Sequence, residues 1–187
     1  VYYALVKPHY SYGGLDMTLN PFLFFLLSLS TVLIAAGGYL INDYRDVGID
    51  KINKPGKVKI GESISGQQVM NWYGGLSLAG VLIGVVLAWQ VGNFRLGVIH
   101  ILSVGLLWFY AKSYKKFFLV GNLVVAGLSA LAVLIVALYE PRLYTAQPIM
   151  GEMMQPVARQ LVMGFVIFAF AISFIRELVK DMEDVEG

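Results

Sequence analysis

The sequence predicts an all-α protein, a polytopic bundle of transmembrane helices. Of its 187 residues, 58% are hydrophobic and 14% are charged, whereas soluble chains are roughly 45–50% apolar and about 25% charged. Several apolar runs reach the ~20 residues that a helix needs to cross a bilayer. Turn-forming stretches such as Asn53-Lys54-Pro55-Gly56 and Gly92-Asn93 separate these runs.

Five complete spans are predicted from the apolar runs. They cover about residues 21–42, 67–91, 94–111, 119–139 and 157–180. Pro21 opens the first span, and proline suits the first turn of a helix. We expect residues 1–187 to form one transmembrane domain, truncated at both ends, because the chain opens in an apolar run and Gly187 interrupts an acidic motif.

Charge and cysteine content narrow the function. The net charge is only +2, so nothing indicates nucleic-acid binding. The absence of cysteine excludes disulfides, thiolate metal ligands and cysteine nucleophiles. If the five spans alternate, ten of the fourteen Lys and Arg residues fall on one side, which the positive-inside rule assigns to the cytoplasm. We expect an integral protein of a bacterial or archaeal cell membrane.

Two acidic groups stand where long apolar runs end. Asp43, Asp46 and Asp50 are spaced i, i+3 and i+7, so on a helix they share one face. Asp181 and Asp184 repeat the i, i+3 step at the end of the last predicted span. Carboxylates so close together repel one another unless a cation lies between them, and they are suitable oxygen ligands for Mg²⁺.

Both acidic groups are predicted to lie at the cytoplasmic face, which favours a shared site over two helix ends that merely emerge into water. Two Mg²⁺ ions bridging one diphosphate would ease its departure. Asn42 adds an amide oxygen and a donor beside the first group. We expect Asp46 and Asp184 to face each other across roughly 8–12 Å, from the length of two metal–carboxylate arms and a diphosphate.

Basic residues near the acids are candidates for binding diphosphate. Lys112, Lys115 and Lys116 follow an aromatic helix end and would act as point charges, although membrane anchoring explains any single one more simply. Arg176 lies five residues before Asp181 in an apolar helix. An ionisable group in such a helix usually serves a function or is paired with another group, and both roles remain open for Arg176.

Two further kinds of residue have a structural explanation. His100 lies in mid-span with no second histidine nearby, so a packed, hydrogen-bonded core residue is favoured over a ligand or a base. Small residues allow helices in a membrane to approach closely. We predict this role for Gly37, Gly38, Gly74, Gly75, Gly80 and Gly84.

Three motifs in order resemble signatures of the UbiA superfamily of intramembrane prenyltransferases. The first is Asn42-Asp43-x-x-Asp46-x-x-x-Asp50 followed by Ile52-Asn53-Lys54-Pro55. The second is Tyr110-Ala111-Lys112-Ser113-Tyr114-Lys115-Lys116 with Gly121-Asn122. The third runs from Arg176 to Gly187 and contains Lys180-Asp181-Met182-Glu183-Asp184. The resemblance covers nearly the whole chain, and family members usually have nine transmembrane helices.

The resemblance implies transfer of a prenyl group from an isoprenyl diphosphate to an acceptor, with release of diphosphate. Asp43, Asp46 and Asp50 would hold one Mg²⁺, and Asp181 and Asp184 a second. Substrate contacts would come from Asn42, Lys112, Lys115, Lys116, Asn122 and Arg176. The third motif looks most like that of members acting on geranylgeranylglyceryl phosphate, while other members prenylate aromatic acceptors.

A different class of function remains open at this point. The chain could be a non-catalytic membrane subunit, either a divalent-cation carrier or a packing partner in a larger membrane complex. A carrier should have acids midway through its spans, whereas here they gather at one predicted face. Membrane lipids surround the protein under every hypothesis.

Overall fold

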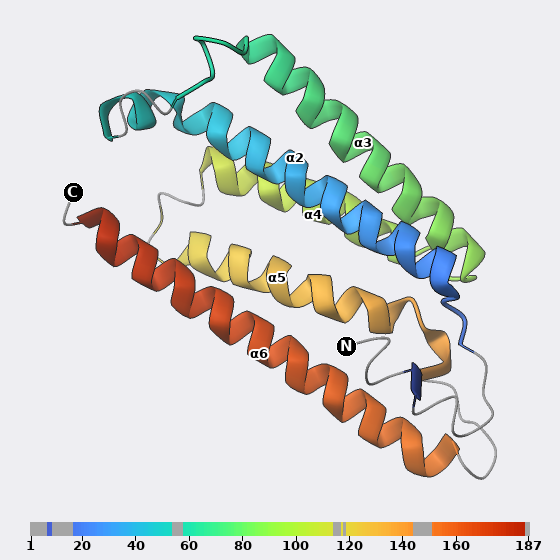
Figure 1. The fold of residues 1–187 in the computed structure, drawn as a ribbon. Helices are drawn as coiled ribbons and strands as arrows, with labels where there is room; N and C mark the ends of the chain where they lie inside the picture. Colours follow the sequence, from blue (N-terminus) through green and yellow to red (C-terminus); the bar gives the residue numbers. More distant parts are fainter. Residues whose placement is uncertain are drawn as a thin grey trace.

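The chain folds into a bundle of long helices, as predicted. The computed structural model describes residues 7–8, 17–53, 58–113, 117, 119–143 and 151–185. Five long helices run alongside one another (Figure 1), and these described parts contain no β-strand. The elements are α2 (Pro21–Asn53), α3 (Gly66–Gln90), α4 (Leu96–Lys112), α5 (Val120–Leu138), the 3₁₀ turn η3 (Pro141–Leu143) and α6 (Gly151–Val185).

The helices have the length and composition of membrane spans. Four of them, α2, α3, α5 and α6, contain stretches long and apolar enough to cross a bilayer, whereas α4 is a shorter apolar helix. On α3, Trp72 and Trp89 are both exposed and lie about 25 Å apart along the helix. Tryptophans favour the two edges of a membrane, whose apolar core is ~30 Å thick. The protein is therefore an integral membrane protein.

The main departure from the predicted spans concerns α2. The first span was predicted to end at about residue 42, but the helix continues through the acidic stretch to Asn53. No proline interrupts the stretch before Pro55, and a single glycine costs a helix only about 1 kcal/mol. The three aspartates of this stretch therefore do lie on a helix, at the spacing from which a shared face was predicted.

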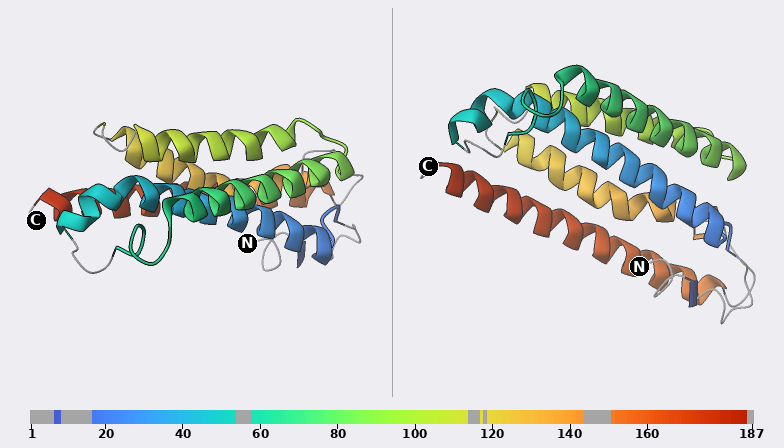
Figure 2. Two further views of the ribbon diagram at one scale, coloured as in Figure 1. Left: turned by 90° about the horizontal axis from the view of Figure 1, so that it is seen from above. Right: turned by 45° about the horizontal axis from the view of Figure 1, so that its top comes forward.

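Glycines bring the helices close together at four of the six predicted positions. A Cβ atom at Gly80 would lie 2.7 Å from Ile34 Cγ1, and one at Gly38 would lie 2.9 Å from Leu107. Gly37 and Gly84 are equally crowded by other helices. Gly74 and Gly75 differ from the prediction in that both are exposed and no described residue lies within 4 Å of an added Cβ. The two views in Figure 2 show α2 and α3 running side by side.

The packed core lies at the end of the bundle opposite the acidic stretch. Its members include Leu27 near the start of α2, Leu87 near the end of α3 and Tyr139 after α5. Glu140 is fully buried there and accepts hydrogen bonds from the main-chain nitrogens of Thr18 (3.1 Å) and Leu19 (3.0 Å). Through these two hydrogen bonds, Glu140 connects the segment before α2 to the chain just after α5.

Candidate functional site

The first acidic group occupies the last turns of α2. Asn42 donates from Nδ2 to Asp46 Oδ2 at 3.0 Å, while Asn42 Oδ1 is buried and has no hydrogen-bond partner. Asp43 is exposed and experiences the negative charges of Asp50 and Asp46. An unsatisfied buried acceptor beside a carboxylate is suited to a cation or to a ligand that donates a hydrogen bond.

Tyr110 links this group to the acids of α6. Its side chain is half-buried near the end of α4 and lines the same cavity as Asn42 of α2 and Glu177 of α6. Asn42 and Asp46 belong to α2, whereas Glu177 and Asp181 belong to α6. Residues about 130 positions apart in the sequence therefore line one cavity together with Tyr110.

Asn122 orients the second acidic group. It lies in the first turn of α5, is buried, and donates from Nδ2 to Asp181 Oδ2 at 2.7 Å. A short hydrogen bond to a carboxylate is of the stronger, charge-assisted kind. The chain enters α5 through Leu119, whose φ of 65° is unusual for a residue other than glycine. The bond ties α5 to α6 beside the acids.

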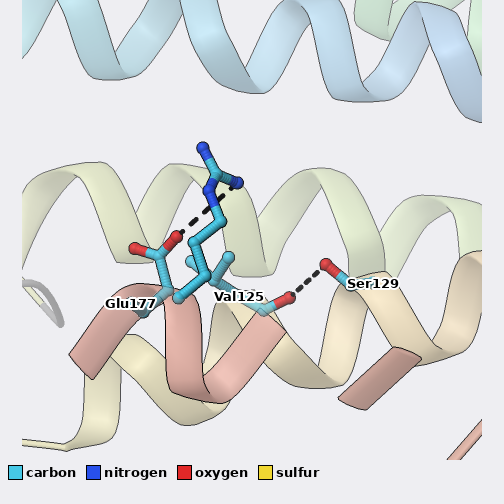
Figure 3. A network of polar contacts seen from close by, with 4 residues as sticks. Val125, Ser129 and Glu177 are labelled. Carbon is cyan, nitrogen blue, oxygen red and sulfur yellow. Dashed lines mark hydrogen bonds and ion pairs between the residues drawn. The ribbon is translucent and has the colours of Figure 1, made fainter. Parts of the chain in front are cut away.

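Glu177 is a buried carboxylate one turn before Asp181. Its side chain is 9% exposed, and its Oε1 lies 4.0 Å from Arg176 Nη1, whereas the Arg176 side chain is 73% exposed (Figure 3). Ser129, on the neighbouring α5, instead bonds within its own helix, to the Val125 carbonyl at 3.0 Å. Either a partner or a function was predicted for Arg176, and Glu177 is such a partner. Arg176 also lines the cavity described in the next paragraph.

A cavity of about 310 Å³ lies between α2, α4, α5 and α6. One end, the acidic end, is lined by Asn42, Tyr110, Arg176, Glu177 and Lys180. Most of the remaining lining is apolar and includes Ile34, Leu107, Leu128 and Ala132. A charged end and an apolar body suit an amphiphilic ligand whose anionic head stays at the acids.

Aromatic and basic groups flank the acidic end on the α2–α4 side. The Arg45 guanidinium lies 5.2 Å from the centre of the Trp108 ring, and Trp108 packs against Tyr73 with ring centres 5.6 Å apart. Such a cation over an aromatic face contributes about 0.5–1 kcal/mol at exposed sites. These contacts join α2, α3 and α4 next to the acids.

Several predicted site residues cannot be compared with the structure. Lys115 and Lys116 lie outside the described residues, as does the side chain of Asp184, so the expected Asp46–Asp184 separation stays a prediction. Lys112 is exposed in the last turn of α4 and is not among the residues lining the cavity. Among the described side chains, no three acids or histidines are close enough to hold a metal ion together.

Sequence reasoning missed three residues of the site. Glu177 and Lys180 line the cavity from α6, and an ionisable residue near the end of an apolar helix is itself a signal of function. Tyr110 was quoted only as part of a motif, since nothing in its spacing shows that it shares a cavity with Asn42 and Glu177. His100 was predicted as a hydrogen-bonded core residue, which is confirmed by its burial and by partners at both ring nitrogens.

Comparison with known proteins agrees with the geometry. The profile of the UbiA prenyltransferase family matches residues 13–187. The chain is 35% identical to the digeranylgeranylglyceryl phosphate synthase of Sulfurisphaera tokodaii, covering 100% of the chain and 64% of that protein. The proteins of the same name from Sulfolobus acidocaldarius and Saccharolobus solfataricus are also 35% identical, covering 88% and 87% of the chain and 53% and 51% of the relatives.

The chain thus spans between about half and two thirds of the length of these relatives. No solved structure is significantly similar to it. The family match covers almost all of the sequence, including both acidic groups and the segment between them. This chain belongs to the UbiA prenyltransferase family.

Proposed function

We propose that the protein transfers a prenyl group from an isoprenyl diphosphate to an acceptor lipid, geranylgeranylglyceryl phosphate, and releases diphosphate. The observation that carries the proposal is a largely apolar cavity at whose acidic end Asn42 of α2, Tyr110 of α4 and Glu177 of α6 come together. The name shared by the archaeal relatives supports the acceptor. The acidic end faces the cytoplasm in this proposal, as the distribution of Lys and Arg indicates.

The reaction breaks the bond between the first prenyl carbon and the diphosphate oxygen, and the electron pair leaves with the diphosphate. The allylic cation that forms would be stabilised by the aromatic ring of Tyr110, which lines this end of the cavity. The acceptor hydroxyl oxygen then bonds to this carbon and loses its proton. Glu177 is a buried carboxylate at the same end of the cavity, and we assign it as the proton acceptor because its position suits general-base catalysis.

The donor atoms fit a divalent cation, which we propose to be Mg²⁺. Asn42 Oδ1 is a buried oxygen without a partner beside Asp46, and Asp181 is oriented by Asn122. Mg²⁺ keeps several waters and binds through one or two carboxylates plus substrate phosphates, so a three-acid cage is not required. Asn42 and Asp46 would bind one ion together with a substrate phosphate, with Asp43 or Asp50 as a further ligand, and Asp181 and Asp184 would bind another. Bound there, Mg²⁺ would neutralise the charge that develops on the leaving diphosphate.

Cationic side chains complete the proposed site. Arg176 and Lys180 line the acidic end from α6, and Lys112 ends α4 nearby. Arginine and lysine both bind phosphate oxygens, and the two substrates together bring three phosphate groups. We propose that Arg176 and Lys180 contact the phosphates within the cavity and that Lys112, Lys115 and Lys116 attract them to it.

The test is a transfer assay with the full-length protein in liposomes. Radiolabelled geranylgeranyl diphosphate and geranylgeranylglyceryl phosphate are supplied with and without EDTA, and the radioactive lipid product is separated. We expect product only when Mg²⁺ is present. Turnover that survives chelation would reject the metal assignment, and failure of several acceptors of different chemistry would favour the non-catalytic alternative.

A further inference from the structure

A polar cluster lies at the end of the cavity away from the acids, where His100 forms part of the lining. The His100 ring lies 2.9 Å from Ser30 Oγ through Nδ1 and 3.0 Å from the Tyr139 hydroxyl through Nε2. Ser30 Oγ also lies 2.7 Å from the Gly80 carbonyl oxygen, and the Tyr139 hydroxyl lies 2.9 Å from the Gly84 carbonyl oxygen, so each hydroxyl has a carbonyl as well as the ring within hydrogen-bond distance. These three side chains, here called the histidine floor, come from α2, α4 and the end of α5 and are bonded to the backbone of α3.

The histidine floor is held in place from every side. His100, Ser30 and Tyr139 are each 0–1% exposed. A Cβ atom at Gly84 would lie 2.4 Å from the imidazole ring, so α3 packs directly against it. Beyond the ring lie buried core residues such as Leu27 and Leu96. The ring therefore cannot move deeper without unpacking the core.

Hydrogen bonding also fixes the ring and hides its polar atoms. A neutral imidazole has one N–H, and each hydroxyl has one hydrogen, so three protons serve the four contacts. Both ring nitrogens and both hydroxyls still find a partner if one hydroxyl donates to the ring in place of a carbonyl. No ring nitrogen is left unpaired toward the cavity, and so the floor can meet an apolar chain end without leaving a buried polar atom unsatisfied.

The depth of the cavity follows from the helix that lines it. Tyr110 at the acidic end and His100 at the floor are ten residues apart on α4, which corresponds to about 15 Å. An extended chain advances about 1.2 Å per bond, and an isoprene unit contributes four bonds to the chain. The space between Tyr110 and His100 therefore accommodates about three extended isoprene units.

We propose that the histidine floor limits the length of the prenyl chain that the protein transfers. The inference rests on the proposed function: the first isoprene unit carries the reacting carbon and lies at the acidic end, and three further units reach the floor. A C20 donor then fills the cavity, whereas a C25 donor meets His100. His100 is thus a specificity-determining residue, placed about 15 Å from the chemistry.

Two substitutions change the depth in opposite directions. His100→Ala removes the ring and deepens the cavity, although it also breaks the hydrogen bonds of the floor. Ser103→Phe adds a ring to the cavity wall one turn nearer the acids. It leaves the floor intact because Ser103, within the described part of the chain, bonds to the Ile99 carbonyl of its own helix at 2.8 Å. The matched control is Leu102→Phe, the adjacent position on α4, whose side chain is 59% exposed and does not line the cavity.

The experiment measures kcat/KM of the full-length protein with C10, C15, C20 and C25 diphosphates. Wild type and Leu102→Phe should prefer C20. The C25/C20 ratio should rise at least tenfold in His100→Ala, and the C15/C20 ratio at least tenfold in Ser103→Phe, because apolar pockets discriminate by about tenfold or more per methylene.

The outcomes separate this inference from the function on which it rests. If the wild type transfers prenyl groups and Ser103→Phe prefers the same donor chain lengths as the wild type, the role of the floor is overturned. This outcome does not depend on whether His100→Ala folds. A wild type that uses C25 as well as C20 overturns it too. No transfer from any donor instead overturns the proposed function itself.

Discussion

Replacing Asn122 with alanine should weaken the second metal site without unfolding the protein. The substitution removes the 2.7 Å hydrogen bond from Asn122 to Asp181. A hydrogen bond to a charged group contributes about 1.5–3 kcal/mol, and loss of such an orienting partner costs ten- to a hundredfold in metal affinity. Because Asp181 is exposed, we take the lower limit and expect the Mg²⁺ concentration for half-maximal transfer to rise about tenfold.

The assay is a Mg²⁺ titration of prenyl transfer at saturating diphosphate. Ser129→Ala is the matched control, because Ser129 lies on the same helix, also lines the cavity and, among the described residues, bonds to Val125 of its own helix. That variant should titrate like the wild type. An Asn122→Ala protein with a wild-type Mg²⁺ requirement and normal thermal stability would refute the role given to this bond.

Further predictions test the acids, the packing and the topology. Asp46→Ala should lower kcat/KM at least a hundredfold while thermal unfolding in detergent stays within a few degrees of the wild type, since loss of a metal ligand is felt mainly in the transition state. Tyr139→Phe should lower the free energy of unfolding by about 1–3 kcal/mol, because it removes a buried hydroxyl with two partners. Gly84→Ala should also destabilise the protein, by about 1–3 kcal/mol, because its Cβ would lie 2.4 Å from the His100 ring. Its control, Gly74→Ala, adds a Cβ to open space and should be neutral or stabilising. Single cysteines in this cysteine-free chain at Gly48 and Met182 should react only with reagent on the cytoplasmic side, and one at Phe94 only from outside; labelling of Gly48 and Met182 from opposite sides would contradict a shared site.

The sequence was sufficient to predict the helices, because apolar runs and the turn-forming residues between them are local features of the sequence. Apolar runs bounded by glycine, proline and asparagine predicted five helices, and the described part of the chain contains five long helices. Their ends were predicted less well. The prediction ended the first span where polarity rises, at residue 42, but the helix continues to Asn53 because no proline interrupts the stretch before Pro55.

The site depended on contacts that a local pattern does not contain. The i, i+3, i+7 spacing placed Asp43, Asp46 and Asp50 on one helix, but it could not show that α2 and α6 line one cavity. The bond between Asn122 and Asp181 joins residues 59 positions apart, and only the packing of α5 on α6 brings them together. Likewise, glycine content alone did not distinguish Gly80, which faces α2, from Gly74, which faces open space.

The convergence of two acidic groups on one diphosphate is tested most directly by metal binding. Mn²⁺ prefers the same oxygen ligands as Mg²⁺, and its binding to the full-length protein can be followed by electron paramagnetic resonance with a non-reactive prenyl thiodiphosphate present. The wild type should bind two Mn²⁺ ions tightly only when the analogue is added, and Asp46→Asn on α2 and Asp181→Asn on α6 should each weaken binding of both ions, because the diphosphate links them. Binding that is unaffected by either substitution, or that does not depend on the analogue, would contradict the account.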